Sequence, residues 1–221
     1  MTFQARIDTW LDVKTHSYNY NELFPNSNQG NYKSAYAVKP SDLAHLAQHS
    51  DQVTELTFHL GAENNTLTPF LQYGPDLEAH SILLELAPNE TLPQASPNSA
   101  LTQNSMEVSI TAADNMIKDL YGKDMHQAVC TKSSRDIVKN YRFKNDVANI
   151  AGKLPQTTHL HFWFGIYSKE ELELGAKENL EVSNFPVLNV ILSKSESVYS
   201  DNLPFDFSVP CPPVCPPDIF L

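Results

Sequence analysis

Two histidines separated by one residue give this chain its clearest potential for chemistry. The segment 158–167 reads THLHFWFGIY, and alternate residues of a β-strand face the same side. One side of such a strand is wholly apolar, with Leu160, Phe162, Phe164 and Ile166. The other side carries His159, His161, Trp163 and Tyr167. Two imidazoles at this spacing can bind one metal ion, so the pattern suggests a divalent metal as cofactor, with His159 and His161 as ligands.

A metal site of this kind needs a third protein ligand. His59 is the first candidate, because Glu55 shares its side of another predicted strand, and His80 is the second. In an alternative interpretation, His159 and His161 lie beside Trp163 on a half-buried sheet face and hydrogen-bond to neighbouring groups. In a third, Trp163 and Tyr167 form the aromatic wall of a pocket for a small molecule or peptide.

Other catalytic motifs do not occur in the sequence. The seven glycines are scattered and form neither GxGxxG nor GxxxxGK[ST], the loops that cradle phosphates. Neither GxSxG nor SxxK marks a nucleophile. We therefore assign no catalytic residue from the sequence.

The elements that would position these side chains can be predicted from periodicity. Phe3, Ile7, Trp10 and Leu11 form the apolar stripe of a short helix, and a second helix begins after Pro40. Strands are expected at 53–60, 67–73, 80–86, 106–110, 157–167 and 186–192, and the first three resemble an antiparallel meander. We predict an α+β fold with a largely antiparallel, or mixed, sheet of about five to six strands and helices packed mainly on one face.

Residues 133–152 are predicted to form a further helix, after one at 112–121. Arg135, Lys139 and Arg142 would then lie on one helical face, at i, i+4 and i+7. Such a basic stripe is typical of a solvated face, and the functional alternative is docking onto an acidic surface.

The chain is expected to form a single α+β domain over residues 1–200. Residues 87–104 carry three prolines and read either as a long loop or as a linker between subdomains. Residues 17–36, rich in Asn and Tyr, are expected to be a loop. Residues 201–221 form a proline-rich segment that should be extended, and its apolar side chains favour docking on the domain or on a partner.

Charge is segregated along the sequence. Residues 40–117 contain ten Asp or Glu and no Lys or Arg, whereas residues 118–153 contain eight Lys or Arg and four Asp or Glu. Such an arrangement can steer a charged partner or orient self-association. The first interpretation is therefore a non-enzymatic binding or assembly protein that self-associates or docks a protein partner. The alternative is a metal-dependent hydrolase that uses His159 and His161.

The overall charge indicates which partners are unfavourable, and the N-terminus and the cysteines indicate the compartment. A formal net charge of −11 disfavours nucleic acid and anionic membranes as partners. The N-terminus does not resemble a signal peptide, and no window has the ~20 apolar residues that span a bilayer. Three cysteines, an odd number, fit a reducing compartment. We expect a soluble cytoplasmic protein.

Overall fold

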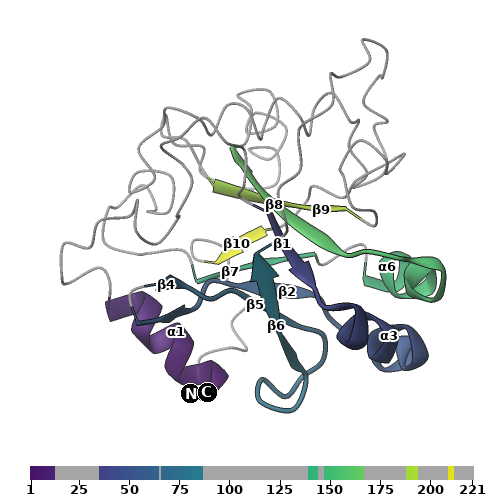
Figure 1. The fold of residues 1–221 in the computed structure, drawn as a ribbon, viewed down its shortest axis with the longest axis horizontal. Coiled ribbons are helices and arrows are strands. Elements are labelled where there is room, and N and C mark those ends of the chain that lie inside the picture. The colour runs from purple at the N-terminus through teal and green to yellow at the C-terminus, as the bar shows by residue number, and fades with distance from the viewer. Residues whose placement is uncertain are drawn as a thin grey trace, which may run out of the picture.

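The protein is described by a computed structural model, shown in Figure 1. The structure describes residues 1–12, 35–64, 66–86, 139–143, 147–166, 188–193 and 209–211. The helices are α1 (Phe3–Asp12), α3 (Pro40–Gln48), η2 (Ser50–Gln52), α6 (Val147–Lys153) and η3 (Leu154–Gln156). The strands are β1 (Ala35–Val38), β2 (Thr57–His59), β3 (Ala62–Glu63), β4 (Thr66–Leu67), β5 (Phe70–Gln72), β6 (Ser81–Leu86), β7 (Asn140–Arg142), β8 (His161–Ile166), β9 (Leu188–Ser193) and β10 (Val209–Cys211).

Within the described ranges, eight strands form one sheet in the order β10-β7-β2-β5-β6-β1-β8-β9. Every neighbouring pair in this sheet is antiparallel. The α+β class with an antiparallel sheet is thus confirmed, and so is the meander, because β2 pairs with β5 and β5 with β6. The sheet has more strands than the sequence led us to expect, since β1, β7 and β10 were not predicted as strands.

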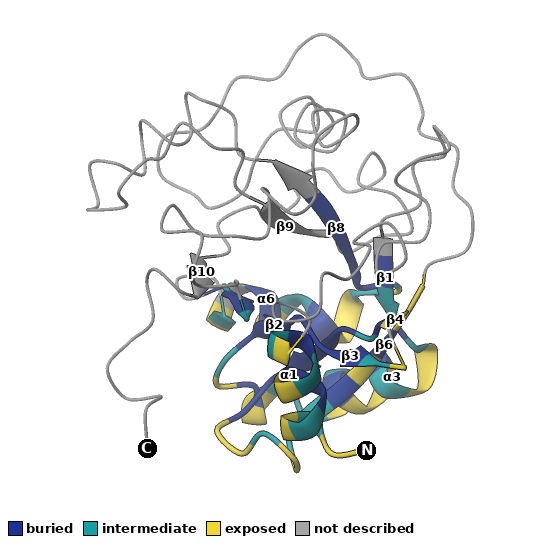
Figure 2. Cartoon of the chain, turned by 90° about the vertical axis from the view of Figure 1, so that its left-hand side faces the viewer, coloured by how far each residue is buried: buried dark blue, intermediate teal, exposed yellow. Residues whose placement is uncertain are grey.

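The sheet curls so that strands far apart in its order face one another. Phe58 on β2 lies against Phe162 and Phe164 on β8, with ring centroids 5.3 and 5.6 Å apart, although three strands separate β2 from β8. Sheet twist makes such curling possible. The aromatic side chains of Phe58, Phe162 and Phe164 inside the curl are fully buried and belong to its core. Figure 2 shows β2 and the described part of β8 in the colour of buried residues.

Helices close the curled sheet from two directions. Leu43 and Leu46 of α3 and Ile150 of α6 belong to the same buried cluster as Phe58. Helix α1 lies beside β3, places Phe3 on Phe70 of β5 with ring centroids 4.7 Å apart, and adds Trp10 to the buried cluster. All three described α-helices thus contribute to the core.

Two predicted boundaries were wrong. Residues 139–143 are not helical: Asn140–Arg142 form β7, and in this part of the chain the helix spans only Val147–Lys153. The reason is that Tyr141 and Phe143, two residues apart as on one face of a strand, both belong to the buried apolar core, and Tyr141 pairs with Phe58, so tertiary pairing outweighs helix periodicity. The basic helical stripe therefore does not form at Lys139 and Arg142. Tyr36, predicted in a loop, lies in β1.

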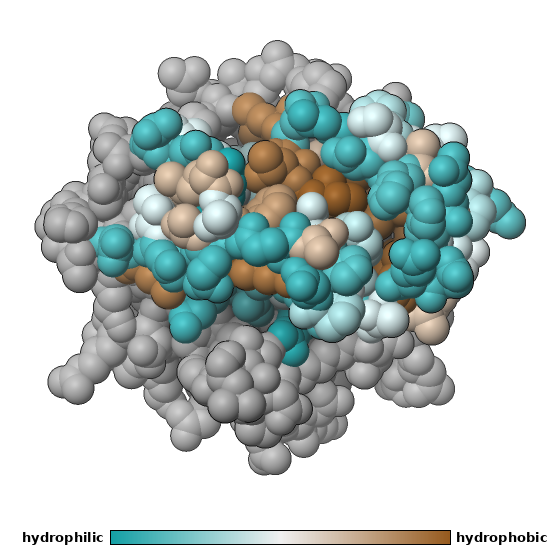
Figure 3. All heavy atoms as spheres, turned by 90° about the horizontal axis from the view of Figure 1, so that it is seen from below, coloured by the Kyte–Doolittle hydropathy of each residue, from teal (hydrophilic) through white to brown (hydrophobic). Residues whose placement is uncertain are grey.

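The described surface is mostly hydrophilic with limited apolar areas. Seen from below, hydrophilic residues frame a central band of apolar surface (Figure 3). The exposed large apolar side chains among the described residues are Met1, Leu83 and Leu86.

Candidate functional site

The histidines predicted as metal ligands on β8 do lie side by side. His161 is 5% exposed and Trp163 2%, whereas His159 precedes the strand and is half-exposed. The rings of His159 and His161 have centroids 5.8 Å apart, and those of His161 and Trp163 are 6.4 Å apart. Leu160, Phe162 and Phe164 occupy the buried apolar face, as predicted. Tyr167 lies outside the described residues.

His59 lies in a different environment from these two histidines. Its neighbour Phe58 faces the inside of the curl and meets Phe162. Because side chains alternate along a strand, His59 leaves β2 on the outer face, as His161 does on the opposite wall. No three His, Cys, Asp or Glu side chains of the described residues are arranged to hold a metal ion. Metal binding by His159 and His161 with a ligand from another part of the chain stays a prediction.

The outer face of β7, β2, β5 and β6 carries two rows of side chains in register. Residues directly opposite one another in antiparallel strands share a face. One row is Arg142, Thr57, Gln72 and Ser81, and the next is Asn140, His59, Phe70 and Leu83. Thr57, His59, Gln72 and Asn140 are all buried. The structure thus assembles a polar group that we call the His59 cluster: His59, Gln72 and Asn140, which are buried, and Arg142, which is half-buried.

Hydrogen bonds fix the state of the His59 ring. The side-chain amide nitrogen of Gln72 donates to the carbonyl oxygen of Gly74 at 2.8 Å, so the Gln72 Oε1 atom faces His59. His59 Nε2 lies 2.8 Å from that oxygen and must carry the proton that it donates. The other ring nitrogen, Nδ1, is therefore an unprotonated acceptor. The ring also stacks on Phe70, with centroids 4.6 Å apart and an angle of 6° between the planes.

Several atoms of this face are buried without a hydrogen-bond partner. They include His59 Nδ1, Asn140 Oδ1, Arg142 Nε and Ser81 Oγ within the described ranges. An unpaired buried polar atom costs about 1–3 kcal/mol, so such atoms are rare in native proteins and call for an explanation. Three of the four belong to the His59 cluster.

Burial also shifts the acid–base properties of this face. Burial lowers the pKa of His59 to about 4, and nearby Arg142 lowers it further, whereas the hydrogen bond that His59 donates to Gln72 raises it. Burial raises the pKa of Glu55, which Arg142 partly offsets, and burial lowers that of Arg142. Shifted pKa values in one cluster are typical of functional sites, although structural networks also produce them.

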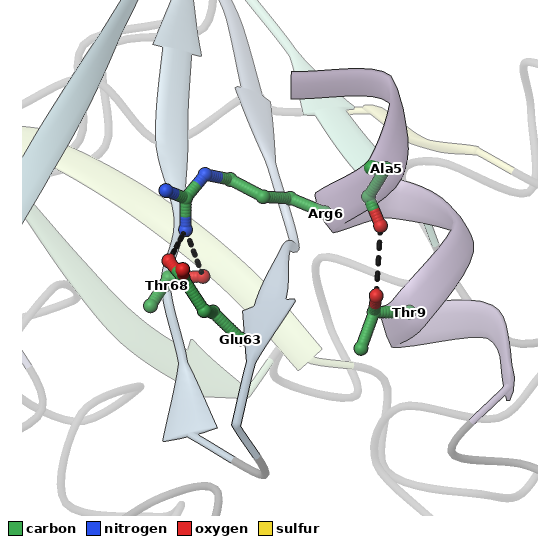
Figure 4. A network of polar contacts seen from close by, with 5 residues as sticks. All are labelled: Ala5, Arg6, Thr9, Glu63 and Thr68. Atoms are coloured by element: carbon green, nitrogen blue, oxygen red, sulfur yellow. Dashed lines mark hydrogen bonds and ion pairs between the residues drawn. The ribbon is translucent and has the colours of Figure 1, made fainter. Parts of the chain in front are cut away.

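Helix α1 is fastened beside the His59 cluster by polar contacts. The Glu78 carboxylate accepts hydrogen bonds from the backbone N–H groups of Phe3 and Gln4, at 3.0 and 2.9 Å, at the start of the helix. The Arg6 guanidinium forms an ion pair with Glu63 and donates to Thr68 Oγ1 (Figure 4). These contacts hold Phe3 on Phe70, the ring on which His59 stacks.

Strand β7 also holds three residues of the proline-rich segment. Leu60 N donates to Lys139 O and Phe143 N to Leu56 O, so residues 139, 141 and 143 turn their backbone groups toward β2. Residues 140 and 142 therefore face β10, opposite Cys211 and Val209. Pro210 stands opposite Tyr141, a position whose nitrogen points away from β7. The proline thus removes no hydrogen bond from the ladder.

Sequence reasoning found His59 and Glu55, missed Gln72 and Asn140, and placed Arg142 in a basic helical stripe instead of a strand. The alternation in Asn140-Tyr141-Arg142-Phe143 was an available signal for a strand, and it places both polar residues on one side. Comparisons of the chain with protein-family models, with curated proteins and with solved structures gave no match. None of the helices in the described ranges combines the length and apolar character needed to cross a membrane.

Proposed function

We propose that this chain is a soluble, non-enzymatic assembly protein of the cytoplasm that self-associates by exchanging its C-terminal segment between copies. The observation that carries the proposal is the antiparallel pairing of β10 with β7 at the end of the sheet order. Strand addition of this kind is a recurring mode of peptide recognition, because main-chain hydrogen bonds supply affinity.

The backbone of β10 suits it to be a detachable strand. Its contact with β7 comprises three residue pairs, and Pro210 turns its nitrogen, which lacks a hydrogen, to the outer side. A proline in that position discourages further strands from adding to β10. When β10 leaves, Asn140 and Arg142 would expose free backbone groups to which another strand can bind.

A second copy is the partner that best fits this edge, because it carries the same segment in the same register. The charge segregation supports self-association as well, since residues 40–117 of one copy are acidic and residues 118–153 of another are basic. Reciprocal exchange between two copies would create a symmetric dimer, the commonest form of soluble oligomer.

The test compares the full chain with a chain that ends at Ser208, by size-exclusion chromatography with light scattering. We expect a concentration-dependent dimer for the full chain and a monomer for the truncated chain. A fluorescent peptide of residues 205–215 should bind the truncated chain. N-methylation of the peptide at Val209 and Cys211 should abolish binding, whereas N-methylation at Val214 should not.

Two results together would contradict the proposal. The full chain would remain monomeric at all concentrations, and the truncated chain would not bind the peptide.

A metal-dependent hydrolase is the second candidate, favoured by the adjacent rings of His159 and His161. It predicts stoichiometric zinc, manganese or iron in untagged protein, and loss of that metal in a folded His159→Ala/His161→Ala variant. Elemental analysis that finds no metal in the parent protein would remove this candidate.

A further inference from the structure

The His59 cluster presents an unusual combination of unpaired hydrogen-bonding atoms. His59 Nδ1 and Asn140 Oδ1 are acceptors, whereas Arg142 Nε is a donor, and all three are buried without a partner within the described part of the chain. His59 and Asn140 are each 5% exposed. A ligand that pairs with all three atoms must therefore have two hydrogen-bond donors, for His59 Nδ1 and Asn140 Oδ1. It must also have one acceptor, for Arg142 Nε.

The strand register makes the residues that carry these three atoms neighbours on one face of the sheet. His59 and Asn140 are directly opposite each other. Their pair is of the type without mutual backbone hydrogen bonds, whose side chains lie closest, with Cα atoms ~4.5 Å apart. Arg142 follows on the same side of β7, two residues or ~7 Å along the strand. The two residues with unpaired acceptors are thus directly opposite each other, and the residue with the unpaired donor is the next one on the same face.

The charge of the cluster favours an uncharged ligand. His59 is neutral near pH 7, because its pKa is about 4. The positive charge of Arg142 interacts with the carboxylate of Glu55, which approaches it from the segment before β2. A cation would be repelled by Arg142, and an anion would meet Glu55 and two acceptor atoms.

We infer that His59, Asn140 and Arg142 form a binding site for a primary carboxamide or ureido group. Its NH₂ group donates one hydrogen bond to His59 Nδ1 and one to Asn140 Oδ1, and its carbonyl oxygen accepts one from Arg142 Nε. The Gln72 side chain positions the site by keeping the proton on His59 Nε2. This inference does not depend on strand exchange, because all three residues belong to β2 and β7.

The test is ¹⁵N NMR of histidine-labelled full chain during titration with acetamide. Substitution His59→Phe assigns the His59 signals and keeps an aromatic ring on Phe70. In the free protein we expect a protonated Nε2 and an unprotonated Nδ1. Acetamide should then shift the Nδ1 signal toward that of a hydrogen-bonded nitrogen, with saturation in the millimolar range.

Two controls make the result specific. N,N-dimethylacetamide has the same carbonyl but no N–H, so it should leave the Nδ1 signal unchanged. The ring of His45, exposed on α3, should respond to neither compound. An Asn140→Leu variant, shown to be folded by its thermal melt, should bind acetamide at least tenfold more weakly.

Three results would overturn the inference. The first is a His59 Nδ1 that carries the proton. The second is an Nδ1 signal that is already hydrogen-bonded in the free protein and unaffected by acetamide, as a trapped water would cause. The third is an equal response to acetamide and N,N-dimethylacetamide.

Discussion

His59 shows how a single buried side chain can set the pH response of the protein. Its ring is stacked on Phe70, bonded to Gln72 and removed from water, so the folded state disfavours its charged form. The unfolded chain has no such restriction, and there the ring takes up a proton near its ordinary pKa of 6.5. Folding stability must therefore depend on pH through this residue.

We predict that stability falls as the pH is lowered from about 6.5 to about 4. In this window the unfolded chain binds a proton that the folded chain does not, so the slope of stability against pH is positive. The shift from 6.5 to about 4 corresponds to a loss of about 3 kcal/mol in the free energy of unfolding. This loss is nearly complete at pH 4, and there is none well above pH 6.5. Urea unfolding at pH 7 and at pH 4.5 measures this difference in the free energy of unfolding.

The matched comparison is His59→Gln against His45→Gln, a residue exposed on α3. The His59 variant should lose most of this pH dependence, whatever its stability at pH 7, whereas the His45 variant should keep it. Equal pH dependence in both variants would show that His59 titrates as an exposed residue does.

At this scale the sequence predicted only part of the site. The apolar face with Phe162 and Phe164 follows from alternation alone, and so does the common side of His159 and His161. The contact between His59 and Gln72 depends on the register of β2 and β5. Neither the hydrophobic periodicity of the sequence nor the spacing of the two residues predicts that they are neighbours. Polar partners of this kind become visible only when the strands are paired.

At the scale of elements, the attachment of α1 to the sheet depends on a close approach at Gly61. A Cβ atom added at Gly61 would lie 2.8 Å from the carbonyl oxygen of Thr68 and 3.1 Å from Arg6 Cβ. The first contact is with backbone and cannot be relieved by turning a side chain. The backbone at Thr68 must therefore move away from residue 61 if this residue is enlarged, and helix α1 must also shift at Arg6.

We predict that Gly61→Ala destabilises the protein by about 1–3 kcal/mol, the usual cost of overpacking. Gly152→Ala is the matched control, because a Cβ atom there meets nothing within 4 Å and the residue lies in α6. That substitution should stabilise by up to about 0.5–1 kcal/mol, since alanine favours a helix over glycine. Thermal unfolding of both variants distinguishes them, and a neutral Gly61→Ala would contradict the close packing of α1.

The helices α1 and α3 could be predicted because each has a full apolar stripe or a proline start signal. Strand β7 could not be distinguished from a helix with the same rules, although residues 140–143 alternate between polar and apolar. Its three residues lie in a stretch whose apolar spacing also fits a helix, and only pairing with β2 and β10 decides between the two.

At the scale of the whole molecule, the curl of the sheet and the position of β10 both depend on contacts between distant residues. Val209 pairs with Arg142, and Phe58 on β2 meets Phe164 on β8 inside the curl, although three strands separate β2 from β8. The order of the expected strands and helices predicted the α+β class, but no local pattern indicates which strand accepts the proline-rich segment. The same edge of β7 is central to the proposed self-association.

The most direct test of that proposal is amide hydrogen exchange along β7. In the full chain, the N–H groups of Asn140 and Arg142 face β10, and those of Tyr141 and Phe143 face β2. In the chain that ends at Ser208, we predict that only Asn140 and Arg142 lose protection, and that the peptide of residues 205–215 restores it. Unchanged protection of Asn140 and Arg142 after truncation would contradict the account, because β7 would then not depend on β10 for its partners.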